Sequence, residues 1–439
     1  MLQNGNQRWR VAVGALAATA LMALAVGCSD GGGDQSGDDP VDAGPLLCPG
    51  AQTPGPGEYT PECCDDTDCA SGRICLEGVC AATLEAGIES VLTDPADDDQ
   101  PSALAIETGC SGKTAAELSA GLPTGVSVVM WGRVDRFGGG GLTDAIEVAV
   151  FKADDFHPEA CEGVTGSKAI RECLHDEAKV GKPIAVVASL TPYPGLATGL
   201  AVQSQFKEGE DCTKDQHLEC PLGFLCDKFD GFTRCGKAHG VYALEAVPTN
   251  VRLIVRASAI DPNHPDGWRD SYVWNVILFS DHLDAKGAGT QPTKYLGKQT
   301  YRFNPTIVGK AQWALVPTTM SLSKISSGNG VIGGRVRDCG KGDRHSWPIS
   351  NAKVNAGVRG AGQSYFNDSE SDTVPSKKRT STNVLGRFAI INVKPGPNRV
   401  VVSGRVGGKD VSLGRTDVYV VPDALVLASL PGYVPKLKK

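Results

Sequence analysis

The sequence lacks the short motifs that mark common hydrolases. It contains no G-x-S-x-G and no H-E-x-x-H, the patterns that place a serine nucleophile or a zinc ion. Its seven histidines are dispersed, at positions 157, 175, 217, 239, 264, 282 and 345. A histidine-based triad or metal centre would need distant segments to meet. We therefore expect a protein that is not an enzyme, with no catalytic residues, no metal and no cofactor.

The sequence also lacks a complete nucleotide-binding loop and an excess of positive charge. The stretch SGKT at 111–114 matches only the end of a P-loop, because Glu107 stands where that loop needs glycine. The glycine run at 138–141 lies between two strand patterns and is typical of a permissive turn. The formal charge of −7 becomes −9 when the two arginines of residues 1–27 are removed. This acidic balance argues against nucleic acid as a partner.

Only one segment is strongly apolar, and it lies near the start of the chain. It runs from 11 to 26, follows Arg8 and Arg10, and ends before Gly27. A bilayer-spanning helix needs about 20 apolar residues, so this shorter run favours a secretory signal over a permanent membrane span. We predict a signal peptide at residues 1–27.

The end of that run resembles the lipobox of bacterial lipoproteins. The sequence LAVG at 24–27 precedes Cys28, although the family pattern prefers leucine where Ala25 stands. The resemblance implies cleavage before Cys28 and attachment of a diacylglyceryl group and palmitate to this residue, which would anchor the chain to a membrane. The alternative is a plain signal peptide with an unmodified cysteine. Because Ser29 rather than aspartate follows, the resemblance favours the outer membrane, facing the periplasm or the cell surface.

Fifteen cysteines are present, and an odd number cannot all pair. With Cys28 assigned to the lipid, fourteen remain, and export to an oxidising compartment predicts that they form disulfides. They fall into three even groups: Cys48, Cys63, Cys64, Cys69, Cys75 and Cys80; Cys212, Cys220, Cys226 and Cys235; and Cys110, Cys161, Cys173 and Cys339. Spacing alone leaves the connectivity within each group open. In the third group, the most local pairing joins Cys161 with Cys173 and leaves Cys110 with Cys339.

Two of these groups form short cysteine-rich modules, at 48–81 and 206–238. Both contain C-x-x-G-x-x-C, and neither has enough apolar residues for a core. A disulfide that closes a loop of this size stabilises the fold by about 3 kcal/mol. Zinc is an alternative, but its ligands usually come as more closely spaced cysteine pairs. Calcium at Asp65, Asp66 and Asp68 is another, beside the expectation that these aspartates cap turns.

Composition favours a mainly β protein. The chain contains 54 glycines and 27 prolines, and short runs of valine and isoleucine lie between Gly, Pro, Asn and Asp clusters. Long helical patterns are scarce. The segment at 28–47 is different, because its Gly, Asp, Ser and Pro residues offer little to bury and predict a flexible tether.

The strongest internal signal is a repeat in two parts. The tripeptide GRV at 132–134 recurs at 334–336. Further on, Gly240 opens GVYALEAVPTN, and Gly386 opens GRFAIINVKPGPN. Each of these predicts a strand with alternating buried residues, a turn led by proline, and a second strand. We therefore predict tandem β-sandwiches with small disulfide-rich modules.

The second copy resembles the carboxypeptidase regulatory-like domain, a transthyretin-like β-sandwich. The residues that carry the resemblance are GGRVRD at 333–338, PISNAKV at 348–354, TSTNVLGRFAI at 380–390 and NVKPG at 392–396. It covers residues 330–428 and implies an accessory domain of the kind that accompanies a catalytic domain. No catalytic domain is recognised in this chain. The first copy is a poorer match, because Pro-Thr-Asn stands where the family expects Pro-Gly.

We predict an ordered series of segments along the chain. They are a signal peptide at 1–27, a tether at 28–47, a cysteine-rich module at 48–81, a divergent first sandwich at 82–281 with a cysteine-rich insertion at 206–238, a linker with a short helix at 282–329, and the regulatory-like sandwich at 330–439. The helix of the linker is expected to end at Pro317.

One loop offers a candidate ligand site. The stretch PNHPDGWRDSYVW at 262–274 places His264, Trp268 and Arg269 between two strands. Loops of sandwiches often carry recognition, and tryptophan can stack on a sugar. The alternative is that Trp268 folds onto its own sandwich and that Trp274 belongs to the core.

Together these features favour a non-catalytic lipoprotein of the cell envelope, acting as a structural or protein-interaction module at the bacterial surface. The alternative is a carbohydrate-binding surface protein, which depends on the loop tryptophans. The sequence does not identify the protein or glycan partner.

Overall fold

The computed structural model describes residues 48–430 with gaps at 50–53, 94–104, 111–112, 138–142, 144, 190–223, 230–231, 238–239, 262, 264–266, 281–298, 321, 323, 340–345, 358–361, 367–374 and 377. The predicted signal peptide, Cys28 and the tether lie outside these residues. Within the described part of the chain, no helix is long and apolar enough to cross a membrane.

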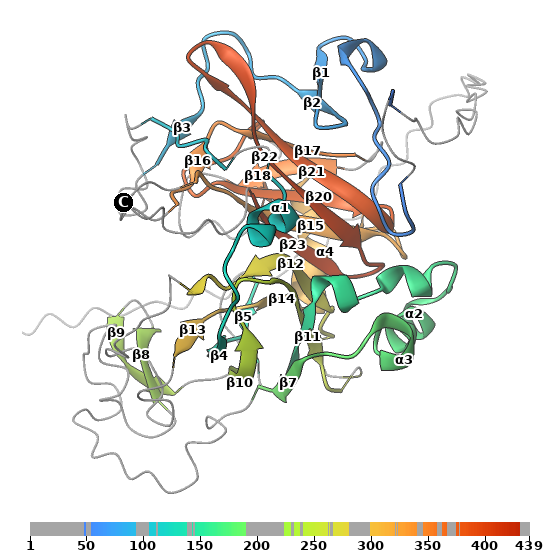
Figure 1. Cartoon of the computed structure of the whole chain (residues 1–439), viewed down its shortest axis with the longest axis vertical. Coiled ribbons are helices and arrows are strands. Elements are labelled where there is room, and N and C mark those ends of the chain that lie inside the picture. Colours follow the sequence, from blue (N-terminus) through green and yellow to red (C-terminus); the bar gives the residue numbers. More distant parts are fainter. Residues whose placement is uncertain are drawn as a thin grey trace, which may run out of the picture. The chain divides into compact units, whose positions relative to one another are not determined.

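Strands dominate the fold, which confirms the prediction of a mainly β protein (Figure 1). A nine-stranded sheet forms its centre, in the order β19-β18-β20-β15-β23-β12-β11-β6-β7. In chain order these strands are β6 (Ile146–Lys152), β7 (Ala185–Ala188), β11 (Arg252–Ala259), β12 (Ser271–Ile277), β15 (Gly330–Val336), β18 (Gly362–Phe366), β19 (Pro375–Ser376), β20 (Arg387–Val393) and β23 (Leu425–Leu430). Because β23 pairs in parallel with both β12 and β15, one sheet joins the two halves that the repeat defines.

Two three-stranded sheets pack against this central sheet. The first has the order β10-β4-β13 and the second the order β17-β21-β22. Their strands are β4 (Ser127–Arg133), β10 (Val241–Pro248), β13 (Thr300–Arg302), β17 (Lys353–Ala356), β21 (Gly396–Val406) and β22 (Lys409–Val420). Each half is thus a two-sheet sandwich, and the halves share hydrogen-bonded strands.

The repeat in the sequence corresponds to a repeat in the fold. Strand β4 pairs antiparallel with β10 and parallel with β13, and β15 pairs in the same two ways with β20 and β23. The Val134 N–H donates to the Gly240 carbonyl oxygen at 2.9 Å, and Val336 donates to Gly386 at 2.8 Å. Both glycines have a positive φ, +69° and +66°, which glycine adopts without a Cβ clash. The two glycines therefore mark the same turn in each half.

In each GRV sequence the glycine lies so close to the backbone of the parallel neighbouring segment that no side chain fits. A Cβ on Gly334 would lie 1.8 Å from the Ala428 carbonyl oxygen, and one on Gly132 would lie 2.0 Å from that of Phe303. We expect Gly334→Ala to lower the free energy of unfolding by about 1–3 kcal/mol, because the backbone must shift. Gly333→Ala is the matched control, since its Cβ would meet nothing closer than 3.6 Å. Urea unfolding measures both variants, and equal losses would contradict this packing.

Separate apolar clusters fill the two sandwiches. Alternate residues of β6 show how the central sheet uses both faces. Ile146 and Val148 belong to the core of the first sandwich, whereas Ala149 and Phe151 belong to a third cluster. That third cluster packs α2 (Ser167–Leu174) and α3 (Glu177–Val180) over the other face of the sheet.

The N-terminal cysteine-rich module packs on the C-terminal half. It contains the hairpin of β1 (Arg73–Leu76) and β2 (Val79–Ala82). The Ala82 N–H donates to Asn355 Oδ1 at 3.0 Å, and Ser403 Oγ donates to the Ala82 carbonyl oxygen at 2.6 Å. Next along the chain, β3 (Val91–Leu92) pairs with β16 (Ile349–Ser350). Residues 82–92, assigned to the first sandwich from the sequence, therefore lie against the C-terminal half.

The predicted helix in the linker is present, but its predicted end is wrong. Helix α4 (Lys310–Thr319) continues past Pro317. A proline inside a helix loses its N–H donor and crowds the carbonyl of residue i−4. Pro317 is buried, and Trp313 and Val316 belong to an apolar cluster whose packing holds this turn. The remaining elements are α1 (Ala115–Ala120), β5 (Asp135–Arg136), β14 (Thr306–Ile307), β8 (Phe224–Phe229) and β9 (Phe232–Lys237).

Candidate functional site

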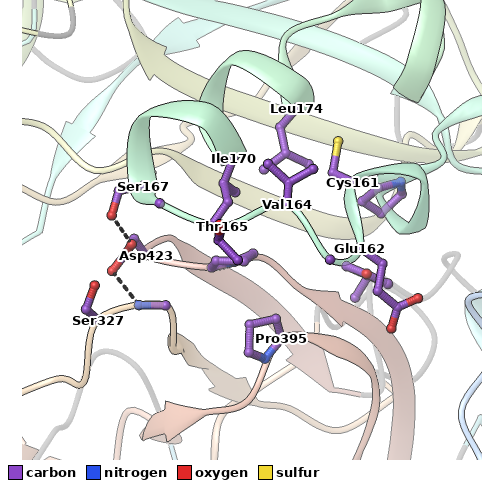
Figure 2. A pocket seen from close by; sticks show the side chains of 16 residues that line it. Cys161, Glu162, Val164, Thr165, Ser167, Ile170, Leu174, Ser327, Pro395 and Asp423 are labelled. Carbon is purple, nitrogen blue, oxygen red and sulfur yellow. Dashed lines mark hydrogen bonds between the residues drawn. The ribbon is translucent and has the colours of Figure 1, made fainter.

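A cleft of about 320 Å³ lies between the helical segment that follows β6 and the C-terminal half (Figure 2). Its volume lies at the lower end of the range for small-ligand sites, roughly 300–1,000 Å³. The lining residues come from the chain around α2, from three loops and from β22: Pro158, Cys161, Glu162, Gly163, Val164, Thr165, Gly166, Ser167, Ile170, Leu174, Ser327, Gly328, Pro395, Tyr419, Pro422 and Asp423.

Helix α2 forms the upper wall of this cleft in Figure 2. Ile170, Cys173 and Leu174 are its buried residues, and the i, i+3, i+4 spacing places them on one face. The disulfide Cys161–Cys173 ties the helix to the short 3₁₀ turn at Pro158–Cys161. The disulfide therefore links the two segments that form this wall, α2 and the 3₁₀ turn.

Asp423 connects α2 with the C-terminal loops. Its Oδ2 accepts a hydrogen bond from Ser167 Oγ at 2.5 Å, and its Oδ1 accepts one from the Gly328 N–H at 3.2 Å (Figure 2). The residue has a φ of +53°, a region in which aspartate and asparagine are enriched among non-glycine residues. The loop thus turns its carboxylate toward the start of α2.

A buried ionic cluster holds α2 to the central sheet. Asp270 Oδ1 accepts from Arg171 Nε at 3.3 Å, and its Oδ2 lies 3.0 Å from His175 Nε2. Burial of Asp270 opposes its charge, but the hydrogen bond to His175 and the charges of His175, Arg171 and Arg256 outweigh it and lower the pKa of Asp270. The carboxylate is therefore ionised at neutral pH.

Tyr419 lines the cleft and is 6% exposed. Burial raises its pKa to about 12, and the negative charges of Glu162 and Glu159 raise it further in the same direction. The phenol is therefore neutral at physiological pH. No described residue forms a hydrogen bond with its hydroxyl group.

The lining carries acceptors and negative charge rather than a catalytic pair. Its charged residues are Glu162 and Asp423, and no histidine, lysine or arginine is among the lining residues. Ser167 donates to the Asp423 carboxylate, and the lining residues include no histidine to take its proton as in a serine triad. The geometry is suited to binding a ligand that donates hydrogen bonds.

The candidate loop at 262–274 does not form a sugar-stacking surface, because Trp268 folds onto its own sandwich, which is the alternative that the sequence offered. Trp268 is only 8% exposed and packs in the core of the first sandwich, with the Arg136 guanidinium 5.3 Å from its ring centroid. The guanidinium of Arg269 lies over the Trp313 ring. A ring buried in this way has no free face for a sugar. His264 lies outside the described residues, and Trp274 packs at the edge of two apolar clusters.

All ten cysteines whose side chains the structure describes form disulfides. The pairs are Cys48–Cys64, Cys63–Cys75, Cys69–Cys80, Cys110–Cys339 and Cys161–Cys173. Every pair stays within the group that the spacing defined, and the last two are the pairs left by the most local assignment. Cys226 and Cys235 are partners in the β8–β9 register, and Cys212 and Cys220 lie outside the described residues.

The residues proposed for a zinc or a calcium site already form disulfides or accept hydrogen bonds. The sulfur atoms of Cys63, Cys69 and Cys80 lie within 4.8 Å of one another, but all three are in disulfides and offer no thiolate. Asp65 caps a 3₁₀ turn by accepting from the Thr67 N–H, as expected for a turn cap. Asp66 and Asp68 likewise accept from backbone N–H groups, at 2.8 Å and 2.6 Å.

The stretch SGKT has a structural role at its last residue. Thr114 caps α1 and forms a capping box with Glu117. The backbone hydrogen bond from Thr114 lowers the pKa of Glu117, which keeps the cap ionised.

Sequence reasoning missed the cleft residues. Between Glu162 and Asp423 the chain runs through the rest of the first sandwich, the linker and most of the second sandwich, and neither residue lies in a recognised motif. The available local signals were Pro422-Asp423, a dipeptide typical of turns, and the two glycines within GVTGS at 163–167. Neither signal indicates that the two segments meet.

The comparisons with known proteins add no function. No family model and no curated protein matches the chain. The shaft pilin SpaA of Lactobacillus rhamnosus GG is 9% identical over 71% of this chain and 100% of the pilin, with a TM-score of 0.14. A streptococcal ancillary pilin is 8% identical over 71% and 63% of the two chains, with a TM-score of 0.14. A fimbrial protein of Bacteroides ovatus is 8% identical over 72% and 50%, with a TM-score of 0.12. Scores this low carry no functional argument.

Proposed function

We propose that the chain is an exported lipoprotein anchored through Cys28, whose β framework is a structural or protein-interaction module at the bacterial surface. The observation that carries this proposal is the pairing of all ten described cysteine side chains. Disulfides persist in oxidising compartments, and pairing among Cys212, Cys220, Cys226 and Cys235 would leave Cys28 for the lipid. The resemblance of residues 330–428 to a transthyretin-like accessory domain supports a non-catalytic role.

The location follows from the same residues. Two or three acyl chains on Cys28 would anchor the protein stably, and Ser29 favours the outer membrane. The tether at 28–47 would hold the folded part away from the lipid surface. The partner in this proposal is another protein.

Replacement of Cys28 tests the proposal. Mass spectrometry of the N-terminal peptide from cell membranes is expected to show a diacylglyceryl cysteine. Cys28→Ser is expected to move the protein out of the detergent-extracted membrane fraction. Cys48→Ser is the control, because it removes a disulfide partner without removing the anchor. An unacylated wild-type N-terminus, or equal membrane retention of all three proteins, would overturn the proposal.

A further inference from the structure

We propose that the cleft beside α2 binds a primary alkylammonium group, carried by a lysine side chain of the protein partner. This inference rests on the proposed role as an interaction module, for which it supplies a contact chemistry. Binding of such a group requires a negatively charged site, a hydrogen-bond acceptor within that site and an apolar wall for the alkyl stem. The described residues provide each of these.

The charges of the cleft select a cation. Glu162 and Asp423 are the charged lining residues. Lys168 follows on α2, but its Nζ lies 3.8 Å from Glu172 and its side chain is 91% exposed. The helix N-terminus would attract an anion, but the Asp423 carboxylate already occupies that position through Ser167. A second anion would meet two carboxylates, whereas an ammonium group would be attracted by both.

Tyr419 is the second, independent observation. Its side chain is buried, it lines the cleft, and no described residue bonds to its hydroxyl group. The hydroxyl oxygen itself is reached by solvent rather than sealed in the core, so a ligand in the cleft can donate a hydrogen bond to it. Because the phenol is neutral, its oxygen can accept from an N–H donor. An ammonium group has three such donors and no acceptor.

The wall between the charged groups is apolar. In Figure 2 the side chains of Val164 and Ile170 lie between Asp423 on one side and Glu162 on the other, with Pro395 facing them. A lysine buries its methylene stem along such a surface while its ammonium group meets polar groups at the end. The cleft therefore fits an extended aliphatic cation.

Calorimetric titration of the full chain in detergent, with its disulfides intact, tests this inference. The probes are Nα-acetyl-lysine N-methylamide, its uncharged norleucine counterpart and 1,5-diaminopentane. We expect the lysine amide to bind, the norleucine amide to bind at least tenfold more weakly, and binding to weaken in high salt. Diaminopentane distinguishes a free diamine from a lysine side chain as the source of the cation.

Matched variants locate the site. Glu162→Gln is expected to weaken binding of the lysine amide roughly tenfold. Glu162 is exposed, so this variant should fold normally. Glu172→Gln, on the same helix but outside the lining, is the control and should leave binding unchanged. Tyr419→Phe removes only the hydroxyl group and is expected to weaken binding as well.

Three results would overturn the inference: equal binding of the lysine and norleucine amides, equal effects of Glu162→Gln and Glu172→Gln, or binding of diaminopentane without binding of the lysine amide. These results are independent of acylation at Cys28. A chain without lipid that still binds the lysine amide would refute the proposed anchor alone, and an anchored chain without binding would refute the cleft alone.

Discussion

Removal of the Cys110–Cys339 disulfide is expected to lower the free energy of unfolding by about 5 kcal/mol. The two cysteines are 229 residues apart in the sequence, and the entropy that a cross-link removes from the unfolded chain grows with the logarithm of the loop it closes. Both residues are buried, at 4% and 3% exposure. The variant Cys110→Ala/Cys339→Ala, measured by urea unfolding under non-reducing conditions, gives the loss.

The disulfide Cys161–Cys173 supplies the control. It closes a loop with a sequence separation of 12, and its cysteines are also buried. The same relation gives about 3 kcal/mol for its removal, so the long-range pair should cost more. A smaller loss for Cys110→Ala/Cys339→Ala than for Cys161→Ala/Cys173→Ala would show that the long loop does not decide the stabilisation.

Asp270→Asn is expected to lower the free energy of unfolding by about 3–5 kcal/mol at pH 7. The substitution removes the carboxylate that Arg171 and His175 contact, whereas the buried Arg256 keeps Glu147 as its partner. Breaking one side of a buried ion pair has a cost of this size. Because the pKa of Asp270 is lowered from 3.8, its stabilising contribution is complete above that value. The contribution is lost as the pH falls through the pKa of the folded state.

Urea unfolding at pH 7 and at pH 3 measures both parts of this prediction. The difference between wild type and Asp270→Asn should be largest at pH 7 and smaller at pH 3. Asp154→Asn is the control, because Asp154 also accepts from an arginine, Arg252, but its side chain is 83% exposed. Exposed pairs of this kind contribute about 0–1 kcal/mol. Similar losses for the two variants would contradict the role assigned to the buried cluster.

The sequence predicted the strand-rich fold and its repeat because both are written in local patterns. Tyr242 and Leu244 alternate with less buried residues in β10, and alternation at period 2 is visible without a structure. The continuous sheet was not predictable in the same way. Strand β23 pairs with β12 across about 150 residues of chain, and a strand that is buried on both faces carries no pattern that names its neighbour.

The candidate site was less accessible to sequence reasoning. The sequence left two interpretations of Trp268 open, because a tryptophan in a loop is exposed or buried according to the residues that meet it, here Arg136 and the core of the sandwich. Glu162 and Asp423 were overlooked because isolated acidic residues are common on surfaces. Their significance depends on the approach of α2 to the loop after β22, which is a tertiary property.

The position of β23 has a consequence for the biogenesis of the protein. Strands β12 and β15 both pair with residues 425–430, so the middle of the sheet stays open until β23, the last described strand, is in place. Until then, each would present an unsatisfied edge, the form in which chains most readily associate with one another. A shortened product that lacks this strand should accumulate as insoluble material.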